Sequence, residues 1–131
     1  MVHEISRMKR VFIWIWCFPQ MLVGLLVKYF TRAKKNGNHY EYKITFGSVS
    51  LGEYIFLCPT HWGNETTLKH EQGHTKQSLY LGWLYLFVIG IPSFVWAGCF
   101  KWYRRKYNVS YYAFYTERWA DKLGGVNRYQ A

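Results

Sequence analysis

His70, Glu71 and His74 have the residue types and the spacing of a metal-dependent hydrolytic site, because they form an H-E-x-x-H sequence. Positions four apart share one face of a helix, so both imidazoles can reach one metal ion. Glu71 lies about 100° further round the helix, where its carboxylate can reach a water on that ion. Zinc lowers the pKa of such a water towards about 7, and a carboxylate can take its proton. The segment therefore predicts two zinc ligands and a general base.

A catalytic zinc site needs a third protein ligand, and the chain, with seven acidic residues and five histidines, offers few. The metzincin class requires glycine at position 77 and histidine at position 80, and this chain has Gln77 and Tyr80 instead. A carboxylate from a second helix is the alternative. Glu117 and Asp121 are four positions apart, so Glu117 can complete a His2Glu site. Asp121 can accept a hydrogen bond from the far nitrogen of a ligand, with His70 as the expected donor.

HExxH on one helix and ExxxD on a later one resemble the gluzincins, the thermolysin-like branch of the zincin metallopeptidases. The resemblance covers residues 67 to 81 and 110 to 123. It implies Zn²⁺ as the cofactor and a peptide or protein as the substrate. It also implies five site residues: the zinc ligands His70, His74 and Glu117, the catalytic base Glu71 and the ligand-orienting residue Asp121.

The surroundings of the two motifs also look like those of small bacterial membrane-associated HExxH proteins, through Gln77-Ser78 and Gly124-Gly125. This second likeness implies a membrane-associated protein, integral or monotopic, in the bacterial inner membrane. The chain departs from thermolysin-like enzymes because it has no large second domain. The histidine and tyrosine that stabilise the transition state in that family have no matching motif here.

Three further residues are candidates for oxyanion or substrate contacts. His61 precedes the predicted zinc helix, although an ordinary loop histidine is the alternative. Tyr112 and Tyr115 precede Glu117, and a tyrosine hydroxyl there can donate to a tetrahedral intermediate. Their alternative role is that of core or interface aromatics.

Composition indicates one domain, or one small domain with an anchor, in 131 residues. Seven Trp and twelve Tyr beside long apolar runs suggest a membrane interface, with an aromatic-rich soluble core as the alternative. The three cysteines are odd in number and indicate no disulfide framework. The formal net charge of +10 first suggests nucleic acid, but no nucleic-acid motif is visible, so we expect no such partner.

The basic residues favour anionic lipid headgroups, because much of the positive charge lies in clusters that adjoin apolar runs. The clusters are Arg7, Lys9 and Arg10; Lys28, Arg32, Lys34 and Lys35; and Lys101, Arg104, Arg105 and Lys106. A nucleic-acid-binding role is a weaker alternative, which predicts a salt-dependent affinity for DNA or RNA.

The first apolar run, residues 11 to 27, is at the short limit for a bilayer span. A signal peptide is the competing interpretation, but no small-residue cleavage site follows. We therefore predict an uncleaved N-terminal anchor over residues 1–35 that either spans or bends at Pro19. Residues 36–131 are the predicted zincin-like domain.

Within that domain, the stretches Tyr40 to Phe46, Val49 to Leu51 and Glu53 to Leu57 are typical of strands. They predict a small antiparallel sheet of two or three strands after a polar linker over residues 33 to 39. Zinc peptidases commonly bind an extended substrate along such an edge, which makes residues 49 to 57 the candidate substrate strand. A purely structural hairpin is the alternative.

The second apolar run, residues 79 to 100, lies between the two halves of the site. A single crossing would separate His74 from Glu117 by about 30 Å, and zinc ligands must lie within about 2 Å of the ion. Gly90-Ile91-Pro92 therefore predicts a turn. The result is an apolar helical hairpin over residues 79–102 that dips into one leaflet or packs as a soluble core. An intramembrane protease is a further option, but the polar residues after HEQGH favour a shallower, wetter site.

Together these patterns predict an α+β, mainly helical protein with a minimal zincin-like core: a small antiparallel sheet, an HExxH helix and a Glu-bearing helix. The predicted function is that of a membrane-associated zinc metalloendopeptidase, with a peptide or protein substrate and anionic lipid as partners. The alternative is a non-enzymatic, basic, membrane-binding structural or interaction protein.

Overall fold

The structure, a computed structural model, describes the backbone of residues 2–128 and the side chains of residues 7–128, and it is α+β and mainly helical, as predicted. The helices are α1 Val2–Trp16, α2 Phe18–Thr31, α3 Glu65–Leu81, α4 Ile91–Cys99, α5 Lys101–Tyr107 and α6 Tyr115–Gly124. The strands are β1 Lys34–Asn36, β2 His39–Glu41, β3 Val49–Leu51 and β4 Tyr54–Leu57. Four short helical turns complete the elements: η1 Pro59–His61, η2 Gly82–Leu84, η3 Leu86–Gly90 and η4 Tyr111–Ala113.

The sheet has four strands in the order β1-β2-β4-β3, and β2 runs parallel to β4. The prediction of a purely antiparallel sheet with two or three strands is therefore wrong. Gly37 and Gly52, with φ of 66° and 67°, close the tight β1–β2 and β3–β4 hairpins. The first hairpin lies partly in the predicted linker. Strand β3 pairs with one edge of β4 through the hairpin. The other edge of β4 is therefore free to pair with β2, which runs in the same direction as β4.

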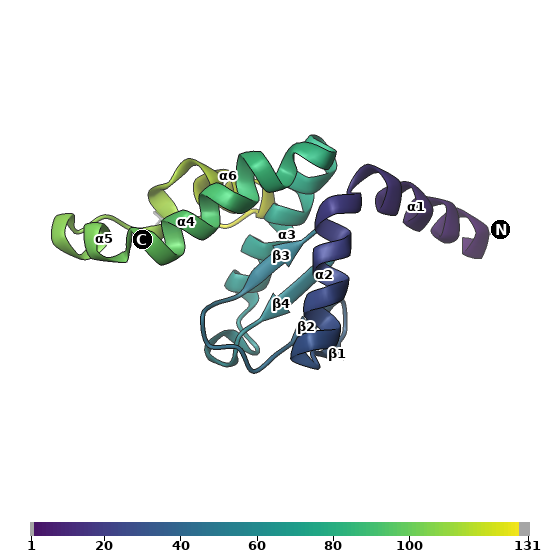
Figure 1. The fold of residues 1–131 in the computed structure, drawn as a ribbon, viewed down its shortest axis with the longest axis horizontal. Helices are drawn as coiled ribbons and strands as arrows, with labels where there is room; N and C mark the ends of the chain where they lie inside the picture. Colours follow the sequence, from purple (N-terminus) through teal and green to yellow (C-terminus); the bar gives the residue numbers. More distant parts are fainter. Residues whose placement is uncertain (1, 129–131) are drawn as a thin grey trace.

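Two helices cover the sheet, with α2 in front of it and α3 behind it (Figure 1). The α2 side contains Phe56, which is fully buried and packs with Tyr42 and the partly buried Val27 of α2. Gly24 allows α2 to approach the sheet, since a Cβ there would lie 2.7 Å from the Tyr54 ring. These contacts hold β3 and β4 against α3, on which the predicted site lies.

The second apolar run bends earlier than the sequence predicts. Helix α3 ends at Gly82, where φ is +55°, and the chain changes direction by 118° between Glu65–Leu84 and Leu86–Cys99. Gly90 has helical φ and ψ, and Pro92 lies in the first turn of α4. The predicted turn at Gly90-Ile91-Pro92 is therefore wrong, because proline is tolerated in a first helical turn, whereas the positive φ at Gly82 ends the helix.

The first apolar run is also bent, by 103° at Cys17, between α1 and α2. Pro19 lies in the first turn of α2, two residues beyond the bend. No single helix within the described residues is both long and apolar enough to cross a bilayer; the two bent pairs meet that measure only when their halves are combined. The division into an anchor over residues 1–35 and a domain over residues 36–131 stays a prediction.

The two bends are docked on each other by hydrogen bonds that connect distant parts of the sequence. The Trp16 indole donates to the Leu79 carbonyl over 2.7 Å, and the Trp83 indole donates to the Ile15 carbonyl over 2.7 Å. Gln20, which is fully buried, donates to the Gly82 carbonyl. As a result α1 and α4 extend in opposite directions from one junction at the end of α3, like the arms of a T (Figure 1).

Candidate metal centre

Helix α3 carries the HExxH residues and begins at a well-formed cap. The Asn64 side chain accepts a hydrogen bond from the Thr67 amide over 3.0 Å, which satisfies one of the free N–H groups of the first turn. His70, Glu71 and His74 are all at least nine-tenths buried. The site is therefore more deeply enclosed than the polar residues after HEQGH suggested.

Helices α3 and α6 meet through two glycines, which brings the two halves of the site together. A Cβ on Gly73 would lie 1.9 Å from the Ala120 carbonyl oxygen, and a Cβ on Gly124 would lie 2.0 Å from the Lys69 carbonyl oxygen. The backbones of the two helices are thus in direct contact. Glu117 and Asp121, on either side of Ala120, reach the histidines as a consequence.

His70, His74 and Glu117 form a buried triad whose ligand atoms all lie within 4.8 Å of one another. Glu117 Oε2 is 3.1 Å from His70 Nε2 and 2.9 Å from His74 Nε2. Burial by itself raises the pKa of Glu117, but the hydrogen bonds from both histidines outweigh it and lower that pKa below its usual range. Glu117 is therefore a carboxylate at neutral pH and is available to a cation.

Both histidines turn Nε2 towards Glu117, because Nδ1 of each ring is already in a hydrogen bond with another side chain. His70 Nδ1 is 2.6 Å from Asp121 Oδ1, and His74 Nδ1 is 2.6 Å from Gln77 Oε1. An Nδ1–H that donates to an oxygen leaves an Nε2 lone pair for a metal. Two imidazole nitrogens and one carboxylate oxygen then converge, and this donor set suits Zn²⁺.

Glu71 lies beside the triad with a side-chain oxygen that has no partner. Its Oε2 is buried and makes no hydrogen bond within the described residues. Burial raises the pKa of the Glu71 carboxyl above its ordinary value, and the nearby His74 and His70 oppose that rise. A buried acceptor without a partner is costly. A water on a metal ion in the triad would satisfy it, so the residues present fit the implied zinc.

Gln77 and Tyr111 contact the ligands, although the motifs did not select them. Gln77 is fully buried; its carbonyl accepts from His74, and its amide donates to the Thr116 carbonyl over 2.9 Å. The Tyr111 hydroxyl donates to Glu117 Oε1 over 2.9 Å. The spacing of Gln77, three residues after His74 on the same helix, was a usable signal. Tyr111 belongs to a group of tyrosines that precede Glu117, with Tyr107, Tyr112 and Tyr115, but no spacing singled it out, because the turn η4 positions it.

The structure places His61 in a polar cluster outside the triad. Its Nδ1 lies 2.8 Å from Ser48 Oγ and 3.2 Å from the thiol sulfur of Cys58, which is buried. Burial lowers the pKa of His61, and the neighbouring His70 lowers it further, so His61 is neutral near pH 7. A contact between His61 and the oxyanion or the substrate stays a prediction.

The two predicted tyrosines differ in their distance from the ligands. The Tyr112 ring packs edge-on against His70, with ring centroids 5.2 Å apart, and the Arg128 guanidinium lies over its other side at 3.4 Å. Arg128 also donates to Asp121 Oδ2 over 2.8 Å, so Asp121 is held from both sides. The Tyr115 hydroxyl instead donates to the Val88 carbonyl, away from the triad.

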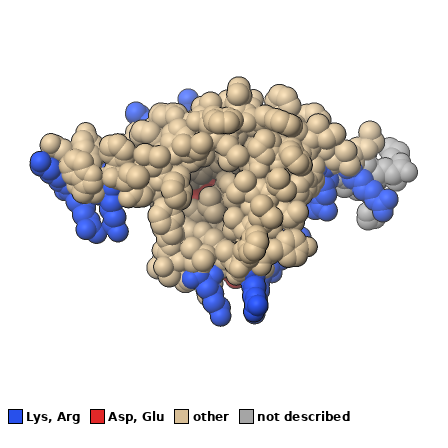
Figure 2. Space-filling model, viewed as in Figure 1, with Lys and Arg blue, Asp and Glu red and all other residues tan. Residues whose placement is uncertain are grey.

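Strand β3 is the open edge of the sheet beside α3, whereas β4 is paired on both sides. Only the first part of the predicted substrate strand, residues 49 to 51, is therefore free at an edge. The Ser50 carbonyl on this strand accepts a hydrogen bond from the buried Tyr85 hydroxyl over 3.0 Å. Figure 2 shows a hollow between α4 and the sheet with acidic atoms at its floor.

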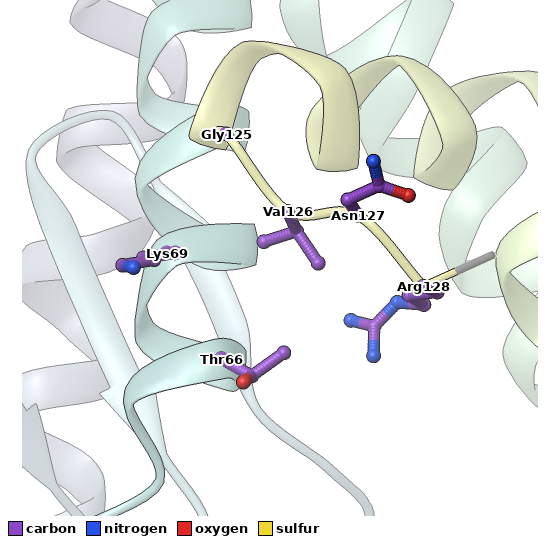
Figure 3. A pocket seen from close by; sticks show the side chains of 6 residues that line it. All are labelled: Thr66, Lys69, Gly125, Val126, Asn127 and Arg128. Atoms are coloured by element: carbon purple, nitrogen blue, oxygen red, sulfur yellow. The ribbon is translucent and has the colours of Figure 1, made fainter. Parts of the chain in front are cut away.

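A second hollow lies at the other end of α3, where the chain leaves α6. Figure 3 shows it between Thr66 and Lys69 of α3 and the segment Gly125 to Arg128. None of the triad residues lines it. It therefore lies beside Arg128, which donates to Asp121, and not beside the triad.

Metal uptake is expected to depend on pH because His74 must lose a proton. Burial by itself lowers the pKa of His74, but the hydrogen bond and charge of Glu117 overcome it and raise that pKa to about 9. In the metal-free protein this proton stabilises the fold most fully below the ordinary pKa of about 6.5 and is lost as pH rises through about 9. Below pH 9, zinc must displace it.

Zinc affinity should therefore rise about tenfold per pH unit between pH 6 and pH 8. Competition with a chromogenic chelator measures this dependence. Calorimetry in buffers of different ionisation enthalpy should show at least one proton released per zinc at pH 7. A flat affinity profile would contradict a His74 that is protonated in the metal-free protein.

Gln77→Ala is expected to weaken zinc binding about 10- to 100-fold, because His74 loses the acceptor that orients it. Gln77→Glu is the matched control, since it keeps an oxygen acceptor for Nδ1 and should bind zinc more tightly than the alanine variant. Equilibrium dialysis with zinc measures both, and circular dichroism checks that the helices remain. Equal affinity of all three proteins would show that Gln77 does not orient the ligand.

Comparison of the chain with protein-family models, with curated proteins and with solved structures gives no match. The resemblance to gluzincins therefore rests on the motif residues themselves. The structure adds that His70, His74 and Glu117 lie together in a buried group that could hold a metal ion.

Proposed function

We propose that this chain is a membrane-associated zinc metallopeptidase of the gluzincin type that hydrolyses peptide bonds. The observation that supports it most is the buried triad with the unpartnered Glu71 oxygen beside it. A structural zinc site is closed by four protein ligands, whereas a catalytic site keeps one position open. The described residues offer a group of three ligands, which matches the open kind.

In this proposal, His70, His74 and Glu117 hold the zinc. When bound, the ion would polarise the substrate carbonyl and lower the pKa of a water. Glu71 accepts the proton of the attacking water and returns it to the leaving amine. Its raised pKa suits both steps, because a base whose pKa is closer to neutral also gives the proton back readily.

The remaining contacts keep the ligands in place during these steps. Asp121 and Gln77 fix the two imidazole rings through Nδ1, and the Tyr111 hydroxyl holds the second oxygen of Glu117. Because Asp121 and Gln77 are buried and Tyr111 is partly buried, water competes little for the same hydrogen bonds. The ligands therefore have little freedom to turn away from the metal.

Strand β3 supports an extended peptide as the substrate. A peptide that pairs with an open edge gains main-chain hydrogen bonds and enters beside α3. The Tyr85 hydroxyl donates a hydrogen bond to the Ser50 carbonyl, so a peptide that pairs with β3 at this carbonyl would have to displace the hydroxyl. The partner and location in this proposal are a peptide or protein substrate and the bacterial inner membrane.

A second candidate function is that of a non-enzymatic, basic, membrane-binding protein. The apolar surface of the helices supports it, since Phe87 and Phe94 are 71% and 65% exposed. This candidate predicts no stoichiometric zinc and no effect of His70→Ala on function. The metallopeptidase predicts one zinc per chain, which is lost in His70→Ala and in Glu117→Ala.

Elemental analysis of the purified protein, combined with hydrolysis of a fluorogenic peptide pool, separates the two candidates. Hydrolysis should stop when a chelator removes the zinc and should return when zinc is restored. Gln72→Ala is the control, because Gln72 is an exposed neighbour on the same helix. Protein without bound zinc, or hydrolysis that survives chelation, would contradict the metallopeptidase proposal.

A further inference from the structure

Three helical segments leave an apolar stripe uncovered. On α1 and α2 most of the exposed residues recur three or four positions apart, which places them on one side of each helix. A third set continues from η2 through η3 into α4. The stripes are Met8, Val11, Phe12 and Ile15 on α1; Leu22, Leu26, Tyr29 and Phe30 on α2; and Leu84, Phe87, Ile91 and Phe94 from η2 to α4. Side chains of this size at this spacing are normally buried against a partner.

The three stripes belong to elements that lie on the same side of the molecule. Figure 1 shows α2 and α4 in front of the sheet and α6, with α1 continuing from the upper end of α2. The hydrogen bonds from Trp16 to Leu79 and from Trp83 to Ile15 lock the two bends together. We call the side formed by α1, α2 and α4 the apolar face.

Charged side chains border the apolar face but do not cover it. Figure 2 shows it almost free of Lys and Arg, which lie mainly along the lower edges of the two arms and at the base, with a few at the upper edge. Arg7, Lys9 and Arg10 are exposed at the α1 end. Lys101, Arg105 and Lys106 are exposed at the α5 end.

Arg104 belongs to the same basic cluster at the α5 end, but its side chain makes contacts within the protein. Its guanidinium donates to the Trp96 carbonyl and lies over the Trp96 and Tyr111 rings, 5.0 Å and 5.3 Å from their centroids. This contact ties the α4–α5 arm to the turn that carries Tyr111. The other basic residues at that end remain available to an external anion.

We propose that the apolar face docks onto an anionic lipid leaflet, with α1, α2 and α4 lying in the interface and no segment crossing the bilayer. Apolar stripes bordered by basic residues complement lipid chains bordered by anionic headgroups. The 103° and 118° bends allow each helix pair to lie within one leaflet. The hollow with acidic atoms at its floor opens on the same face, so docking brings this hollow to the lipid surface (Figure 2).

Flotation of the full chain with preformed vesicles tests the docking, and it needs no hydrolytic activity. Vesicles of phosphatidylcholine with a quarter phosphatidylglycerol should bind the protein on the order of a hundredfold more tightly than pure phosphatidylcholine, and added salt should reduce the difference. Equal binding to both compositions would overturn the anionic part of the proposal.

Phe12→Glu and Phe87→Glu test the stripes on two different elements. Each should weaken vesicle binding by about tenfold or more. Ile44→Glu is the matched control, since Ile44 is an exposed apolar residue in a loop outside the stripes and should bind like the wild type. Circular dichroism and zinc content confirm folding of each variant. Unchanged vesicle binding, accompanied by loss of a dimer in light scattering, would show that a second copy covers this face instead.

Docking in one leaflet also predicts that the parts of the chain outside the apolar face lie on the outer side of the vesicle. Protease added outside should remove tags from both ends of the chain. In a Cys99→Ser background, an impermeant maleimide should label Lys35→Cys, because Lys35 is exposed and the native Cys17 and Cys58 are buried. Protection of either tag, or of Cys introduced at position 35, would overturn the one-leaflet arrangement even if the zinc site and the hydrolysis are established.

Discussion

Glu71→Gln is expected to keep bound zinc and to lower the rate of peptide hydrolysis by about 10²- to 10⁴-fold. The amide has nearly the same shape as the carboxylate but cannot accept the proton of the attacking water. The zinc ligands His70, His74 and Glu117 are unchanged, so the metal should remain. Zinc analysis and hydrolysis of a fluorogenic peptide measure the two outcomes on the same sample.

The stability of this variant provides a further readout. Burial raises the pKa of Glu71, so the charged carboxylate costs folding free energy at neutral pH. Glutamine removes that charge, and the variant should unfold at the same temperature as the wild type or a higher one. Retained hydrolysis in a zinc-loaded Glu71→Gln protein would contradict the role of Glu71 as general base. Loss of both zinc and thermal stability would instead show that Glu71 is mainly structural.

Gly73→Ala is expected to destabilise the fold and to weaken zinc binding at least about tenfold, because the new methyl group would force α6 away from α3. A Cβ there would lie 1.9 Å from the Ala120 carbonyl oxygen, a distance that no rotamer can relieve. Glycine to alanine in a helix usually stabilises by about 1 kcal/mol. Overpacking should cost about 1–3 kcal/mol of stability, which outweighs this gain and makes the substitution destabilising.

Gly98→Ala on α4 is the matched control. Its Cβ would lie 3.8 Å from the Phe46 ring, an ordinary contact distance, so the helix propensity gain should remain. Thermal denaturation with zinc titration compares the two variants. A Gly73→Ala protein that is as stable as the wild type and binds zinc normally would contradict the close contact of α3 with α6.

The parts of the fold that could be predicted depend on contacts within a few residues. The HExxH spacing and the Glu117–Asp121 spacing each lie within about one helical turn, and helix geometry decides which of these side chains share a face. Residues 65 to 81 accordingly form the expected helix. The same local geometry places Gln77 three residues after His74, within reach of its ring.

Contacts between distant residues decided the rest. His70 and Glu117 are separated by 47 positions, and their distance is set by the packing of α3 against α6 at Gly73 and Gly124. The order of the strands and the parallel pairing of β2 with β4 depend on which hairpin takes the outer edge, and no local pattern encodes that choice. Tyr111 reaches Glu117 because α4 and α5 carry it back to α6.

The bend of the second apolar run also depends partly on sequence pattern and partly on contacts between distant residues. Sequence patterns established that the run must turn back, because the two halves of a zinc site have to meet. The structure placed the turn at Gly82, where the docked Trp16 and Trp83 side chains stabilise it. The sequence by itself determined the chemistry of the site, since residue type and helical spacing are local. The tertiary structure decided its assembly, its burial and the exposed apolar face, since these depend on packing between segments far apart in the chain.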